Sequence, residues 1–208
     1  MNTKTVSKLA LGLLTALSLN AMAEENPWMV RVRATNLNWD NGQTATVQAL
    51  DVNAKNKTIP EFDVSYFFTK NIAAELVLTY PQTVEIRAGA TSLGHVKALP
   101  PTLLAQYHFT NLGPIKPYIG AGVNYTIFSS RKELNTGNIA GLVSTENRSF
   151  GLAGQVGADY MLNKNWGINV DVKYIKMSSD VIVNSSNTHI GNLNLSPIAT
   201  SVGVTYKF

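Results

Sequence analysis

Charged side chains stand two residues apart in several segments of the chain, among them Arg31 and Arg33, Glu61 and Asp63, and Asp171 and Lys173. A spacing of two places both side chains of a pair on the same face of an extended strand. The residues that alternate with them are largely apolar and would form the opposite face. A buried charge is costly unless an opposite charge pairs with it. The pattern therefore predicts ion pairs in the interior of a β-structure.

Residues that could carry catalysis are sparse. The chain has three histidines, and no G-x-S-x-G, H-E-x-x-H or EF-hand spacing occurs. Ser92 and His95 lie close together in a connecting segment, but no oriented base accompanies them, and such a base is what activates a serine nucleophile. We expect that the protein is not an enzyme and has no catalytic residue, no metal site and no cofactor.

Eight segments alternate apolar and polar residues with the period of two that a β-strand requires: residues 28–36, 59–69, 72–80, 99–109, 117–128, 149–162, 166–177 and 198–208. Three of the connections between them are short and four are long. This alternation of lengths is typical of an all-β fold, an eight-stranded antiparallel up-and-down transmembrane β-barrel with both chain ends on one side. No apolar run is long enough for a helical span, which needs about 20 residues.

Residues 1–23 have the pattern of a cleaved secretory signal. A positively charged start and a short apolar stretch precede Ala21-Met22-Ala23, a small-x-small cleavage pattern. We expect residues 24–208 to form one outer-membrane β-barrel domain with four long extracellular loops. The 15 Lys and Arg of this part exceed its 13 Asp and Glu by only two, so nucleic acid is not an expected partner.

The chain ends on an aromatic residue, Phe208, which closes the last alternating segment. Chain ends usually fray, whereas a barrel must pair its last strand with its first. A terminal Phe on such a strand resembles the assembly signal of Gram-negative outer-membrane proteins. We expect an integral protein of the cell outer membrane, inserted by the barrel-assembly machinery. Lipid and lipopolysaccharide are further expected partners, the latter through basic residues near the outer rim: Arg87, Lys97, Arg131, Lys132, Arg148 and Lys176.

Four segments, residues 71–76, 99–107, 117–126 and 154–160, are similar to those of the outer membrane protein W (OmpW/AlkL) family. The Pro-Pro-Thr-Leu and Tyr-Ile-Gly-Ala-Gly-Val-Asn-Tyr blocks within them are the most specific. The resemblance implies a narrow outer-membrane channel for passive uptake of small hydrophobic molecules. Eight strands leave an interior just wide enough for side chains or one small ligand. The alternative is a closed structural or receptor barrel, for phage, bacteriocin or a host surface, without transport.

The side chains expected inside the barrel fall into two sets. Channel-lining positions are Val77, Leu104, Lys173, Asp171, Glu75 and Ile175. A polar plug is expected from Arg31, Arg33, Asp63, Gln106, Gln155 and Asp159. The two arginines are expected to pair with Asp159, Asp171, Asp63 or Glu75. Val77 and Leu104, nearer the loop end, are expected to form an apolar constriction above the plug. Lys173 in mid-channel favours an amphipathic cargo over a purely apolar one.

Pro100 and Pro101 open the fourth predicted strand. Neither residue can donate a ladder hydrogen bond, so prolines belong at strand starts or edges. One interpretation is that they simply start this strand at the loop rim. The other is a lateral exit: missing hydrogen bonds between the third and fourth strands would let an apolar molecule leave the channel sideways into lipid.

Overall fold

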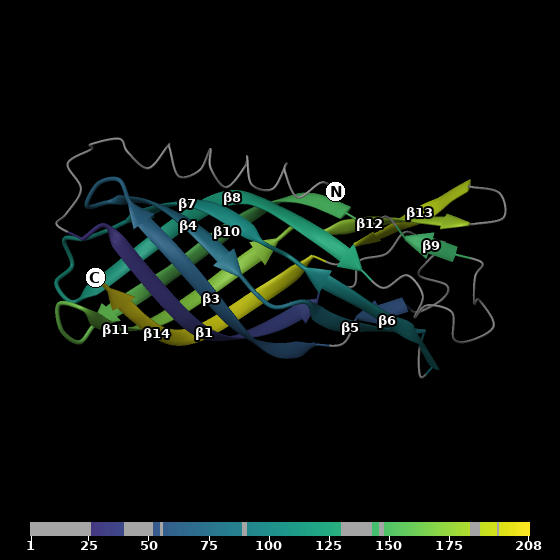
Figure 1. The fold of residues 1–208 in the computed structure, drawn as a ribbon, viewed down its shortest axis with the longest axis horizontal. Helices are drawn as coiled ribbons and strands as arrows, with labels where there is room; N and C mark the ends of the chain where they lie inside the picture. The colour runs from purple at the N-terminus through teal and green to yellow at the C-terminus, as the bar shows by residue number, and fades with distance from the viewer. Residues whose placement is uncertain are drawn as a thin grey trace, which may run out of the picture.

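The computed structural model describes residues 26–39, 52–54, 56–88, 91–129, 143–145, 148–183, 188–194 and 196–208. Eight strands in these ranges form a closed barrel: β1 (Trp28–Trp39), β3 (Lys57–Phe67), β4 (Ile72–Leu78), β7 (Thr102–His108), β8 (Ile115–Ser129), β10 (Arg148–Met161), β11 (Trp166–Ile175) and β14 (Pro197–Lys207). Each is antiparallel to the next in this order, and β14 closes on β1 (Figure 1). The predicted fold class is confirmed.

The closing pair extends along the whole length of β1. Met29 lies opposite Lys207 at one end and Trp39 opposite Pro197 at the other. The Phe208 amide also donates to the carbonyl of Trp28, at 3.1 Å. Strand β1 therefore continues beyond its predicted end at residue 36, because its last residues keep their hydrogen-bonded partner in β14.

The connections at the two ends of the barrel differ in structure. Three short turns join β3 to β4, β7 to β8 and β10 to β11 at the end where Phe208 lies (Figure 1). At the opposite end, β2 (Val52–Ala54), β5 (Gln82–Ala88) and β6 (Thr91–Leu99) extend the sheet from β8. Beside them, β9 (Val143–Thr145), β12 (Ser178–Val183) and β13 (Thr188–Asn194) form a second sheet. The long connections therefore contain β-structure of their own.

Strand periodicity sends polar side chains inward and apolar ones outward. Along β1, for example, Arg31 and Arg33 are buried while Val32 between them is 58% exposed. Aromatic side chains on the outer surface pair edge to face at the short-turn end, as in Trp28–Tyr66 at 4.9 Å between ring centroids. An apolar outer surface bounded by aromatic residues suits a lipid environment. Within the described ranges, no helix is long and apolar enough to cross a membrane.

Candidate functional site

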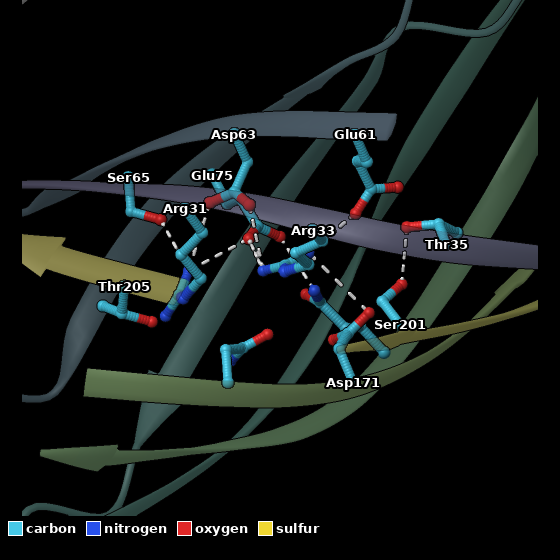
Figure 2. Close-up of polar contacts among 12 residues, drawn as sticks. Arg31, Arg33, Thr35, Glu61, Asp63, Ser65, Glu75, Asp171, Ser201 and Thr205 are labelled. Carbon is cyan, nitrogen blue, oxygen red and sulfur yellow. Dashed lines mark hydrogen bonds and ion pairs between the residues drawn. The ribbon is translucent and has the colours of Figure 1, made fainter. Parts of the chain in front are cut away.

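A network of buried ion pairs crosses the interior of the barrel around Arg31 and Arg33 of β1, in the half nearer the short turns (Figure 2). The Arg31 guanidinium donates two parallel hydrogen bonds to Asp159 of β10, from Nε to Oδ1 at 3.0 Å and from Nη2 to Oδ2 at 2.7 Å. Its Nη1 donates to Asp63 at 3.3 Å, Ser65 at 3.2 Å and Glu75 at 3.1 Å. Bidentate arginine–carboxylate pairs are among the strongest hydrogen bonds in proteins. Arg31 therefore ties β1 to β3, β4 and β10.

Arg33 and Lys173 extend the network toward the loop end. Arg33 donates from Nη1 to Glu61 and from Nη2 to Glu75, each at 2.9 Å. Lys173 Nζ donates to Glu61 Oε1 and Asp171 Oδ1, each at 2.7 Å. Lys173 is completely buried. The predicted mid-channel cation is thus neutralised by two carboxylates, and the charge itself faces no open passage.

Uncharged side chains complete the network around Asp159. Its Oδ1 accepts from Asn169 Nδ2 at 2.9 Å and from Thr205 Oγ1 at 2.5 Å. The Tyr118 hydroxyl accepts from Asn169 at 3.1 Å, and Gly157 opposite it leaves room for the ring, which a Cβ there would overlap. Asn169, Thr205 and Tyr118 were not among the predicted members of the plug. The only feature of the sequence that pointed to them was the strand alternation, which places their side chains inside the barrel.

A chain of amides continues the network toward the short turns. Gln155 Nε2 donates to Glu75 Oε2 at 2.9 Å, and Gln106 Nε2 donates to Gln155 Oε1 at 2.8 Å. His108 Nε2 lies 3.0 Å from Gln106 Oε1, the oxygen of the same amide. An apolar cluster lies at the same end of the barrel interior: Met29, Phe67 and Ala73.

Above the network, toward the loop end, the described interior side chains form no further ion pair and are apolar or uncharged, with Thr102, Asn124 and Thr126 buried among the apolar ones. A cavity of about 20 Å³ lies there, lined mainly by buried apolar side chains from six strands and their ends: Leu37, Ile59, Val77, Ala98, Ile175, Met177 and Ala199. A volume of that order holds about one water molecule. Of the predicted channel-lining residues, Val77 and Ile175 line this cavity. Leu104 is buried but lies lower, opposite Glu75 at the level of the network.

The barrel wall is interrupted beside this cavity. The ladder between β4 and β7 ends at Val77 opposite Thr102, and the next pair along that direction is Gln82 opposite Ala98, between β5 and β6. Among the described residues, the segment 79–81 has no ladder partner on either side. Pro100 and Pro101 lie between β6 and β7 rather than inside one strand, because neither can donate to a ladder. Pro100 also lines the cavity.

The arrangement makes the two halves of the interior chemically different. The described network combines three cations with five carboxylates, all at most 4% exposed. Side chains fill the barrel at the level of this network, as expected for eight strands. From the loop end inward, the described interior side chains are apolar or uncharged at the level of the cavity and form a continuous set of ion pairs below it. The only described break in the wall lies at the apolar level.

Three of the basic residues expected at the outer rim, Lys97, Arg148 and Lys176, are exposed. Other positions singled out in the sequence lie outside the described residues, wholly or in their side chains: residues 1–23, Arg87, Ser92, His95, Arg131 and Lys132.

The comparisons with known proteins agree with this fold. Residues 24–208 match the model of the OmpW family. An uncharacterised outer-membrane protein, y4mB, of Sinorhizobium fredii is 42% identical over 193 residues, which cover 88% of this chain and 80% of that protein. Outer membrane protein W of Escherichia coli is 34% identical over 181 residues, which cover 85% of each chain.

Among solved structures, the outer membrane protein OprG of Pseudomonas aeruginosa matches with a TM-score of 0.70 and 26% identity, over 89% of this chain and 97% of that one. The family match and the relatives named as outer-membrane proteins locate the barrel in the outer membrane of a Gram-negative cell. The chain belongs to the OmpW family of outer-membrane β-barrel proteins.

Proposed function

We propose that this barrel is a passive uptake channel for small hydrophobic or amphipathic molecules, which enter at the loop end and leave sideways into the lipid. The observation that carries the proposal is the interruption of the wall at residues 79–81, which lies beside an apolar cavity and above the buried ion-pair network. Val77 and Ile175 would contact the cargo, and Glu75, Asp171 and Lys173 would form the floor. No catalytic step, metal or cofactor enters this proposal.

The two exits from the apolar layer differ in their free-energy cost. A route straight down requires the network to open, and separating one partner of a buried ion pair costs about 3–5 kcal/mol. A route through the wall at 79–81 breaks no ladder hydrogen bond among the described residues. An apolar molecule also gains free energy on entering lipid, at roughly 25 cal/mol per Å² of apolar surface removed from water. The lateral exit is therefore the easier one for such a cargo.

The test replaces both prolines, Pro100→Val and Pro101→Thr, so that the missing ladder donors are restored. Pro117→Val is the matched control, because Pro117 lies in β8 near the short turns, away from the interruption. Uptake of alkanes and of amphipaths of equal chain length is measured in cells that lack the native protein and carry each variant. The double variant should reduce uptake, and the control should not. Unchanged uptake in the double variant would refute the lateral exit.

The ion-pair network also favours a second candidate, a closed receptor barrel without transport. A plug that fills the interior stabilises the barrel whether or not the layer above it ever receives a cargo. Two results together would favour this candidate: no uptake difference between expressing and deletion strains, and no conductance in planar bilayers. Loss of binding by a phage or bacteriocin in the deletion strain would then support it directly.

A further inference from the structure

Three unsatisfied polar atoms belong to residues that line the small apolar cavity. Trp39 Nε1, Thr79 Oγ1 and Gln82 Oε1 are buried and have no hydrogen-bond partner within the described part of the chain. They come from the end of β1, the segment after β4 and the start of β5. Buried polar groups in proteins nearly always have a partner. Because the residues that carry these atoms line one cavity, a polar group bound there would have three possible hydrogen-bond partners.

The chemistry of these atoms selects the kind of group. An indole N–H is a donor only. The Gln82 amide already donates from Nε2 to the carbonyl of Tyr80 at 2.9 Å, so its Oε1 remains as an acceptor. The Thr79 hydroxyl can do either. A ligand hydroxyl both accepts and donates at a single oxygen, so it can satisfy Trp39 and Gln82 together. A carbonyl or ether oxygen can satisfy only the donor, and an alkyl group satisfies neither.

The size and surroundings of the cavity agree with a hydroxyl. Its volume of about 20 Å³ fits one water-sized group. The one carboxylate in its lining belongs to Glu61, whose Oε1 already accepts from Arg33 and Lys173. Pro100 also lines the cavity. An alkyl chain attached to the bound hydroxyl would therefore lie next to the interruption of the wall.

We propose that this cavity binds the hydroxyl group of an alcohol whose apolar chain extends through the interrupted wall toward the lipid. Trp39 donates to the hydroxyl oxygen, and the hydroxyl donates to Gln82. The inference rests on the proposed function for the path of the chain, and it names the cargo class more narrowly as molecules with one hydroxyl on a small apolar body.

The direct test observes Trp39 itself in the intact barrel. Nitrogen-15 NMR of the full protein in lipid nanodiscs resolves indole N–H signals, and Trp28 and Trp166 on the outer surface serve as internal controls. Titration with 1-octanol should shift the Trp39 signal, and octane should not, while the two control signals should respond alike to both. The proposed hydroxyl site would be wrong if the Trp39 signal does not shift with 1-octanol or shifts equally with octane. A persistent Trp39–water contact at saturating 1-octanol would also contradict it, because the cavity would then hold water only.

The variant Gln82→Leu removes the acceptor and keeps a similar volume. It should weaken the 1-octanol response of Trp39 by roughly three- to tenfold, the loss expected for one neutral hydrogen bond. Thr200→Val is the control, because it removes a hydroxyl from the outer surface. Heat-dependent gel mobility checks that each variant is folded. A Gln82→Leu barrel that is folded and responds like the wild type would refute the hydroxyl site.

The two proposals fail in different ways. If 1-octanol shifts the Trp39 NMR signal but cells with the proline variant take up all molecules normally, the hydroxyl site is supported and the lateral path is wrong. If the proline variant loses uptake but Trp39 is insensitive to 1-octanol, the path stands and the hydroxyl site is wrong.

Discussion

Replacing Arg31 with methionine should destabilise the barrel by about 3–5 kcal/mol, the usual cost of removing one partner from a buried ion pair. Although Arg31 contacts three carboxylates, the cost should not be three times as large, because two of them keep another cation. Asp63 and Glu75 keep Arg33 as a cation, at 3.1 and 2.9 Å. Asp159, in contrast, has no ion-pair partner other than Arg31 within the described residues. The main loss is thus one buried carboxylate without a counter-charge.

The free energy of unfolding is measured by urea titration of the barrel refolded into lipid, followed by tryptophan fluorescence and gel mobility. Arg148→Met is the matched control, because Arg148 is exposed, and it should change stability by less than about 0.5 kcal/mol. A second substitution, Asp159→Asn, removes the carboxylate charge that Arg31→Met leaves without a partner and keeps the side-chain shape. The double variant should therefore be more stable than Arg31→Met alone.

Two outcomes would refute this reasoning. One is an Arg31→Met barrel within about 1 kcal/mol of the wild type, since the network would then contribute little. The other is additivity, in which the double variant loses the sum of the two single losses. Contacting partners in one network should show a coupling of about 0.5–3 kcal/mol.

Three further predictions concern packing, conductance and assembly. Gly122→Ala should cost about 1–3 kcal/mol, because its Cβ would overlap the backbone of β7, whereas Gly154→Ala, whose Cβ meets no atom within 4 Å, should be neutral in the same urea titration. Arg33→Ala should open the network and raise single-channel conductance in planar bilayers above that of the wild type; an equally silent channel would contradict a plug that blocks ions. Deletion of Phe208, whose amide bonds to Trp28, should lower the amount of folded barrel in the outer membrane at equal synthesis, as measured by heat-dependent gel mobility of membrane fractions.

The period of two was sufficient to predict which side chains point inward. Arg31 and Lys173 are both buried at the positions that strand parity assigned to them, because parity depends only on neighbouring residues. Partner choice depends on register across the barrel. The sequence offered several carboxylates for Arg31, and nothing local to them distinguished Asp159 as the bidentate partner.

Trp39 shows why the upper cavity was not predicted. The residues that follow it are rich in Asn, Asp and Gly, which usually mark a loop. The strand nevertheless continues through Trp39 because β14 supplies a partner there, opposite Pro197. The prolines were predicted to open the fourth strand, and β7 does begin directly after them, but residues that were predicted as a loop form the additional strand β6 before them, since the sequence does not reveal which neighbour such a segment will pair with.

The bond between Arg31 and Asp159 joins residues 128 positions apart in the chain. Strands β3 and β4 can offer Arg31 its first carboxylates soon after β1 forms, but Asp159 comes only with β10. During assembly the early strands therefore carry a guanidinium that has Asp63 and Glu75 as counter-charges but still lacks its bidentate partner, and an incompletely paired charge is expensive within a membrane. Contacts between distant parts of a chain also form slowly. Arg31 consequently obtains its bidentate partner only late in assembly, and an insertion intermediate that stalls before β10 lacks the bond that ties β1 across the barrel interior.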